Sequence, residues 1–209
     1  MNILSISDKT FSFLYSPEIL KRISDVDLII GCGDLPYYYQ EYIAMKLRAP
    51  LLFVRGNHDQ EIEYSNDGDR KAPRGGIDLH CRVVQQGDFI FAGVEGSIRY
   101  KNEGKFQYTQ KEMWFNIFRL IPSLLLNRLL YGRYLDVFVT HAAPWGIHDK
   151  SDWTHQGVRA FLWFIQRFKP KYHLHGHNHV YEVDTITRTK VGKTIVLNTY
   201  GYRETELML

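Results

Sequence analysis

Five short apolar runs of this chain each lead into polar side chains that can bind a cation. The clusters that follow these runs are Asp8, Asp34, Asn57-His58, His141 and His177-Asn178-His179. Short apolar runs bounded by glycine or polar residues are typical of buried strands. In open α/β sheets, the loops at the carboxyl ends of the strands converge on one crevice. The repetition therefore predicts a sheet with a single polar site along one edge.

Helices are expected between the first three of these runs. Strands are predicted over residues 3–7, 26–30 and 50–54, with one helix beginning after Ser16 and a second over residues 38–48. Ser16-Pro17-Glu18 has the features of a helix start, namely an N-cap hydroxyl, a proline at the first helical position and an acidic first turn. The alternation of strand and helix predicts parallel βαβ units and an α/β fold.

The second half of the chain is expected to be richer in strands. Residues 60–80 are polar and predict a long loop, followed by a hairpin of residues 83–84 and 89–94. Further strands are predicted over residues 135–140, 172–175, 180–187 and 193–199, with an amphipathic helix over residues 158–165. The sequence shows no repeat and no domain boundary, so we expect a single domain over residues 1–209.

Residues 105–133 form an apolar, helical insert in this pattern. The stretch Thr109-Gln110-Lys111-Glu112 is a capping box, and polar residues then recur at helical spacing among Trp, Phe, Ile, Leu and Met. Pro122 is expected to divide the segment into two helices. The segment carries five basic residues and one acidic residue. Two interpretations remain open: a helix pair packed on the sheet, and a lid or membrane-facing surface.

Composition favours a soluble globular protein with an anionic ligand. Hydrophobic residues make up 44% of the chain, and the formal net charge of +3 is too small to indicate nucleic-acid binding. Cys32 and Cys81 make no disulfide framework. The N-terminus lacks a basic region followed by a long apolar segment, and the chain has no apolar run of about 18 residues. We therefore expect a cytoplasmic protein, with peripheral membrane contact through residues 105–133 as a further possibility.

The clustered side chains indicate metal-assisted phosphoryl chemistry. Carboxylate, carboxamide and imidazole groups form a mixed oxygen and nitrogen ligand set that suits manganese, iron or zinc. Two such ions about 3.5–4 Å apart clamp a phosphoryl group and generate hydroxide from bound water. A shared carboxylate usually bridges the two ions, and Asp34 is the natural candidate for that position.

The order of these motifs resembles the calcineurin-like metallophosphoesterase family. The family pattern is Asp-x-His, then Gly-Asp, Gly-Asn-His-Asp/Glu, a lone His and Gly-His-x-His. The corresponding segments of this chain lie between residues 8 and 179 and are Asp8-Lys9-Thr10, Gly33-Asp34, Gly56-Asn57-His58-Asp59, Thr140-His141 and Gly176-His177-Asn178-His179. Residues 140–155 are also similar to the branch that contains the mammalian brain metallophosphoesterases.

The resemblance implies a four-layer α/β/β/α sandwich of the metallophosphoesterase type with two divalent metal ions. Manganese is the first choice of metal, and iron, zinc, nickel and magnesium are alternatives. One ion would bind Asp8, Asp34 and His179, and the other would bind Asp34, Asn57, His141 and His177. The resemblance also assigns catalytic roles to His58, which would protonate the leaving oxygen as a general acid, and to Asp59, which would orient His58 or its loop.

The pattern leaves the roles of three positions to be settled, namely Thr10, Asp149 and His155. Thr10 stands where the family has a histidine. A hydroxyl is a poor substitute for imidazole, so the first metal site should be looser, completed by water or more selective. Asp149 and His155 either line the substrate side of the site or cap a loop.

We therefore expect metal-dependent hydrolysis of a phosphodiester or phosphomonoester by a metal-bridging hydroxide, with a small, nucleotide-like substrate. One alternative is hydrolysis of a lipid-linked pyrophosphate, with residues 105–133 as a lid. Another is a metal-stabilised, non-catalytic interaction module, which Thr10 favours and His58 opposes. Nucleic acid is not an expected partner, and the sequence predicts no particular oligomeric state.

Overall fold

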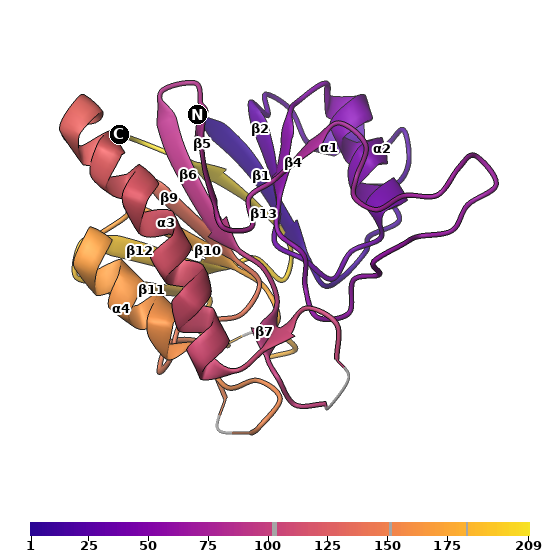
Figure 1. Ribbon diagram of the computed structural model, residues 1–209. Coiled ribbons are helices and arrows are strands. Elements are labelled where there is room, and N and C mark those ends of the chain that lie inside the picture. Colours follow the sequence, from indigo (N-terminus) through magenta and orange to yellow (C-terminus); the bar gives the residue numbers. More distant parts are fainter. Residues whose placement is uncertain (102–103, 151, 183) are drawn as a thin grey trace.

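The computed structural model describes residues 1–101, 104–150, 152–182 and 184–209. Two β-sheets pack face to face, and the first has the strand order β13-β1-β2-β3-β4 (Figure 1). Its strands are β1 (Asn2–Ser7), β2 (Leu28–Gly31), β3 (Leu51–Phe53), β4 (Gly76–Asp78) and β13 (Gly201–Glu206). Strands β1 to β4 run parallel, and β13 pairs antiparallel with β1.

The second sheet has the strand order β11-β12-β10-β9-β6-β5. Its strands are β5 (Arg82–Gln86), β6 (Phe89–Val94), β9 (Val137–Thr140), β10 (Tyr172–His175), β11 (Arg188–Val191) and β12 (Thr194–Asn198). The four central strands run parallel, and the two edge strands pair antiparallel with them. A separate two-stranded ladder joins β7 (Ser97–Ile98) to β8 (Gln107–Tyr108).

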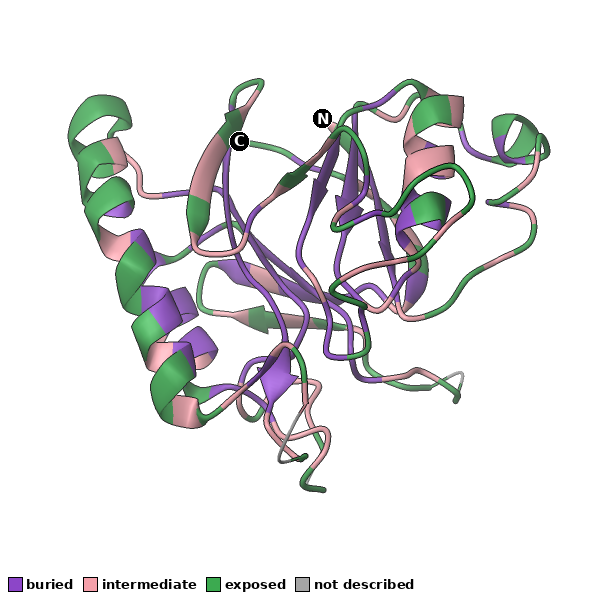
Figure 2. Ribbon diagram, turned by 45° about the vertical axis from the view of Figure 1, so that its right-hand side comes forward, coloured by how far each residue is buried: buried purple, intermediate pink, exposed green. Residues whose placement is uncertain are grey.

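Helices cover the outer faces of both sheets, and three apolar cores hold the layers together. Helices α1 (Ile19–Arg22) and α2 (Tyr37–Leu47) pack on the first sheet, and α3 (Gln110–Tyr131) and α4 (Arg159–Phe168) pack on the second. Between the sheets, Ile30 and Leu52 share a buried cluster with Phe91 and Val139, in the purple interior of Figure 2. The expected α/β/β/α sandwich is confirmed.

Strand register brings the carboxyl ends of the parallel strands to one edge of the molecule. In the first sheet, Ile6 of β1 lies opposite Gly31 of β2, which lies opposite Phe53 of β3. In the second sheet, Val139 of β9 lies opposite Leu174 of β10. The polar clusters that follow these strands therefore meet at the same edge.

The expected break at Pro122 is wrong, because α3 continues as one helix through this residue. The missing backbone N–H costs an α-helix about 3 kcal/mol. Leu120 and Leu124, on either side of Pro122, are buried in the core of the second sheet, so packing holds the helix together. The capping box is confirmed, since Glu112 N donates to Thr109 Oγ1 and Thr109 N donates to the Glu112 carboxylate. No helix in the described part of the chain is long and apolar enough to cross a membrane.

Two other expectations about strands need correction, and one strand was not predicted. The predicted strand over residues 180–187 is wrong, since its described residues, which exclude Val183, form no strand before β11 begins at Arg188. Residues 60–80 are not entirely loop, because β4 forms within them and extends the first sheet. Strand β13 was not predicted, because its sequence Gly-Tyr-Arg-Glu-Thr-Glu has little apolar character; its backbone pairing with β1 stabilises it.

Candidate metal centre

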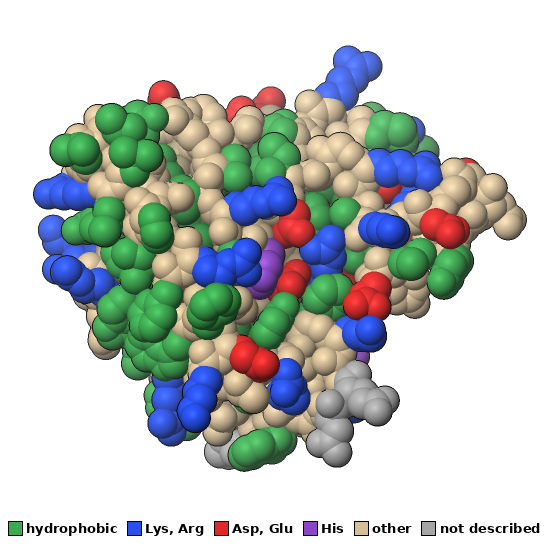
Figure 3. All heavy atoms as spheres, in the orientation of Figure 1, with side chains coloured by type: hydrophobic (Ala, Val, Ile, Leu, Met, Phe, Trp, Pro, Cys, Tyr) green, Lys and Arg blue, Asp and Glu red, His purple; other side chains and the backbone are tan. Residues whose placement is uncertain are grey.

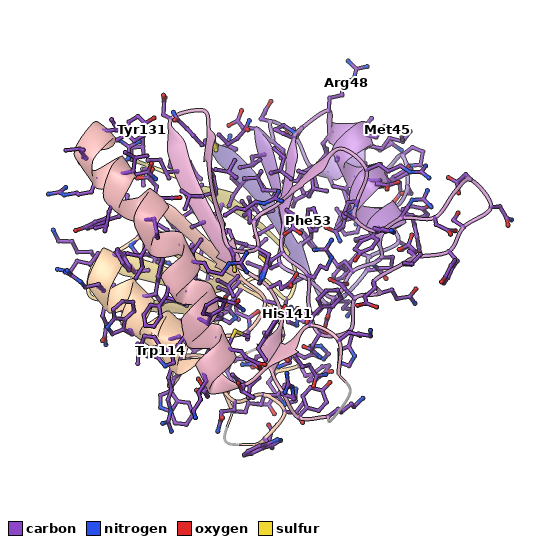
Figure 4. The ribbon with its side chains drawn as sticks, in the orientation of Figure 1. Met45, Arg48, Phe53, Trp114, Tyr131 and His141 are labelled. Carbon is purple, nitrogen blue, oxygen red and sulfur yellow. The ribbon has the colours of Figure 1, made fainter. Side chains whose placement is uncertain are left out.

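Three strand ends from the two sheets bring ligand atoms to one point. Asp34 follows β2, His141 follows β9 and His177 follows β10, and each offers one atom within 4.8 Å of the atoms from the other two. His141 is fully buried and is labelled near the middle of the molecule in Figure 4. Convergence at this edge confirms that side chains from several strand ends meet in one place, as the strand-end pattern predicts.

Asn57 completes this cluster with a carboxamide oxygen. Its Oδ1 lies 3.0 Å from His141 Nε2, and Asp34 Oδ2 lies 3.3 Å from the same nitrogen. His141 Nδ1 donates to the Cys32 carbonyl at 2.8 Å, which turns Nε2 toward the cluster. Two oxygen acceptors and a ring nitrogen therefore share a buried space, an arrangement that a cation satisfies. The donor chemistry fits a divalent transition metal.

Electrostatic coupling sets the protonation states of Asp34 and His141. Burial disfavours charge on both Asp34 and His141, but each group stabilises the charge of the other. As a result the pKa of Asp34 falls to about 2 and the pKa of His141 rises to about 9. Burial lowers the pKa of His177 to about 4, so this imidazole is neutral at pH 7. A bound metal ion would take the place of the proton on His141.

The predicted first metal site is less enclosed than the second. Asp8 has a positive φ of 61°, and both of its carboxylate oxygens accept from His177 N. His179 Nε2 lies 3.7 Å from Asp8 Oδ1, and the His179 side chain is 38% exposed. Thr10 is exposed. The structure thus brings Asp8 and His179 together beside the cluster, on its more open side.

Glycine is required where the two loops that follow β2 and β3 approach each other. A Cβ on Gly33 would lie 2.5 Å from Gly56 N and 2.7 Å from His141 Nδ1, and Gly33 has a φ of +92°. A Cβ on Gly56 would overlap the Asp34 carboxylate. The motif glycines therefore permit the backbone contact that places Asp34 against His141.

His58 lies at the rim of the cluster with its ring exposed to solvent. Its backbone N donates to Asp34 Oδ1 at 2.7 Å, which attaches the His58 loop to the cluster. Its Nε2 lies 3.4 Å from the Tyr100 hydroxyl, and Asn57 Nδ2 donates to the same hydroxyl at 3.1 Å. Tyr100 thus joins the amide of Asn57 to the ring of His58. Sequence reasoning missed Tyr100, because it belongs to no motif and lies 42 residues from His58.

We expect Tyr100→Phe to reduce turnover about fivefold, because loss of one neutral hydrogen bond costs about 1 kcal/mol. The phenyl ring retains the packing, so metal content should stay at the wild-type value. Steady-state kinetics and elemental analysis check the two expectations. Unchanged turnover would show that the hydroxyl does not position His58.

Asp59 contacts backbone groups of the two loops. Its carboxylate accepts from Gly56 N at 2.7 Å, Leu35 N at 3.0 Å and Asp34 N at 3.2 Å. These bonds join the turn after β2 to the loop after β3. Burial and the Asp34 charge raise the pKa of Asp59 to about 7. The geometry therefore favours orientation of the loop over direct orientation of the His58 ring.

Asp149 and His155 lie in different surroundings. Asp149 Oδ2 accepts from Gly146 N at 3.0 Å and Gly157 N at 3.2 Å, which is the contact pattern of a loop-capping residue. The ring of His155 lies 5.4 Å from the ring of His177, and its Nδ1 donates to Asp152 at 2.8 Å. His155 therefore borders the metal cluster, whereas the Asp149 carboxylate joins the two ends of its own loop at Gly146 and Gly157.

Comparisons with known proteins are consistent with this site. The family model described as calcineurin-like phosphoesterase matches residues 1–181. No curated protein matches the chain. Among solved structures, the protein TT1561 of Thermus thermophilus is 16% identical, with a TM-score of 0.59 over 96% of this chain and 89% of that one. GAP50, the anchor in the inner membrane complex of Plasmodium, is 10% identical, with a TM-score of 0.50 over 95% and 70%. At these identities the structural likeness shows a shared fold.

Proposed function

This chain belongs to the calcineurin-like phosphoesterase family, and we propose that it hydrolyses a phosphodiester or phosphomonoester with the help of two divalent metal ions. The observation that carries the proposal is the convergence of Asp34, Asn57, His141 and His177 beside the exposed ring of His58. Ligands for a cation and a free imidazole then face the same solvent-accessible rim. This arrangement suits metal-assisted hydrolysis, in which a separate group protonates the leaving oxygen.

The proposal assigns separate roles to the metal ligands and to His58. Asp34, Asn57, His141 and His177 would hold one ion, and Asp8, Asp34 and His179 the other; manganese is the proposed metal. When bound, such ions neutralise phosphoryl charge and lower the pKa of water. The ring of His58 would donate a proton to the leaving oxygen. Tyr100 and the His58 backbone contact with Asp34 would hold that ring in place.

A small, nucleotide-like ester is the proposed substrate. A cavity of about 260 Å³ beside the cluster is lined by His58, Tyr38 and the carboxylates of Asp34, Asp59 and Glu63, and an adjoining hollow of about 460 Å³ is lined by the exposed rings of Tyr15, Tyr38 and Tyr64. Tyr38 borders both spaces. Aromatic side chains provide faces on which a base can stack. These volumes are of the order that small-molecule sites occupy.

The proposal is tested by hydrolysis of bis(p-nitrophenyl) phosphate and p-nitrophenyl phosphate after chelation and after addition of one metal at a time. We expect turnover with manganese, loss of turnover after chelation, and recovery when manganese is returned. Iron, zinc, nickel and magnesium are compared in the same assay. If none of the five metals supports turnover, the enzymatic proposal fails and the non-catalytic interaction module replaces it.

A further inference from the structure

Helix α3 exposes a continuous apolar face. Six large side chains form this face, here called the α3 stripe: Phe115, Phe118, Leu125, Leu126, Leu129 and Leu130. Leu129 is 81% exposed and Phe115 is 65% exposed. Their spacing of three and four residues places them on one side of the helix. Figure 3 shows hydrophobic side chains gathered along α3 on the left of the molecule.

The opposite face of α3 is buried in the protein. Met113, Ile117, Leu120 and Leu124 are fully or almost fully buried against the second sheet and α4. At about 100° per residue these four positions lie across the helix from the α3 stripe. One face of α3 therefore stabilises the protein, while the other offers an apolar surface about 23 Å long.

Exposed cationic side chains accompany the α3 stripe. At about 100° per residue, Arg119 lies among the side chains of the stripe, and Lys111 lies in line with it beyond its N-terminal end; both are exposed. The adjoining α4 adds exposed Arg159 and Arg167 and carries no acidic residue. Glu112 is the only acidic residue in the two helices, and Arg99 pairs with it at 3.1 Å. An apolar surface with a cationic border complements anionic lipid headgroups above an acyl layer.

Aromatic side chains lie between α3 and α4 beside the stripe. The Trp114 ring centroid is 5.6 Å from that of Phe118 and 5.2 Å from that of Trp163. Both indoles are partly exposed. An indole in this setting can contact lipid with its apolar body and the headgroup layer with its N–H. The cluster extends the apolar surface from α3 onto the first turns of α4.

We propose that α3 docks along its length on a membrane surface rich in anionic lipids. A second copy of this chain complements the surface less well, because stripe-to-stripe pairing would bring the arginines of one helix toward those of the other. In Figure 4, Trp114 and His141 are labelled in the lower half of the molecule, and Tyr131 is labelled near its top. Gln110 Nε2 donates to the Gly157 carbonyl, which joins the start of α3 to the loop that carries His155.

The test measures sedimentation of the full chain with vesicles of phosphatidylcholine, with and without phosphatidylglycerol. We expect binding only to the anionic vesicles and weaker binding at high salt. The double variant Leu125→Ser/Leu129→Ser should bind about tenfold more weakly or worse. Lys111→Gln/Arg119→Gln should lose the preference for phosphatidylglycerol. The matched control is Leu20→Ser/Met45→Ser, which changes two exposed apolar side chains of α1 and α2 and should bind like the wild type.

Thermal unfolding shows whether each variant is folded. Turnover of bis(p-nitrophenyl) phosphate is measured in parallel, so that a loss of membrane binding can be distinguished from a loss of enzymatic activity. Equal sedimentation of the wild type and the Leu125→Ser/Leu129→Ser variant would overturn the proposal. Absence of wild-type binding to anionic vesicles would overturn it as well. A concentration-dependent dimer in ultracentrifugation that this variant abolishes, without vesicle binding, would assign the stripe to a second copy instead.

Discussion

Replacing Asp34 with alanine is expected to lower kcat/KM for bis(p-nitrophenyl) phosphate by about three orders of magnitude or more, because several kcal/mol of metal-based stabilisation are lost. Asp34 makes two contacts that matter here. Its Oδ2 faces His141 Nε2 at 3.3 Å, and its Oδ1 accepts from His58 N. The variant therefore loses a metal ligand and the attachment of the His58 loop together. Steady-state kinetics and elemental analysis measure both effects.

The matched control for this variant is Asp88→Ala. Asp88 is an exposed carboxylate in the turn between β5 and β6, and it should keep wild-type turnover and metal content. Circular dichroism establishes that both variants are folded. A folded Asp34→Ala protein that retains two metal ions and loses less than about tenfold in turnover would contradict the assignment of Asp34 as the shared ligand.

For His58→Ala we expect kcat to fall about 10²- to 10⁴-fold, the usual contribution of a general acid, while metal content stays unchanged. The His58 ring is exposed, and its recorded hydrogen bond is to the Tyr100 hydroxyl, so its removal leaves the Asp34–Asn57–His141 contacts in place. This separation of kcat from metal content distinguishes a proton donor from a ligand.

The leaving group provides an internal control for His58. p-Nitrophenolate departs readily without a proton, whereas a phenolate of higher pKa needs one. His58→Ala should therefore lose more activity on a phenyl ester than on the corresponding p-nitrophenyl ester. Equal losses on the two esters would show that His58 binds the phosphate without protonating the leaving oxygen.

The sequence predicted where the candidate metal centre lies, because its polar residues directly follow strand ends. A buried strand, a glycine and a ligand side chain follow one another in the chain at Gly33-Asp34 and Gly56-Asn57. Once the strands are parallel, their carboxyl ends must meet at one edge. The position of the polar cluster on the sheet could therefore be predicted without knowledge of any side-chain contact.

Other features depend on contacts between distant residues, which leave no local pattern. Tyr100 reaches His58 and Asn57 only because the fold returns residues 97–108 to the site edge. Strand β13 forms through backbone bonds to β1, which need no apolar side chains. The helix through Pro122 persists because tertiary packing outweighs the local penalty of proline.

By itself, then, the sequence determined the layered α/β architecture and the edge at which its polar side chains gather, since both follow from short-range order along the chain. Only the tertiary structure decided that Asp59 and Asp149 bind backbone N–H groups, because hydrogen-bond partners are chosen in space. It also decided which face of α3 is buried. An apolar helix contains two candidate faces, and only the position of the second sheet leaves the α3 stripe in solvent.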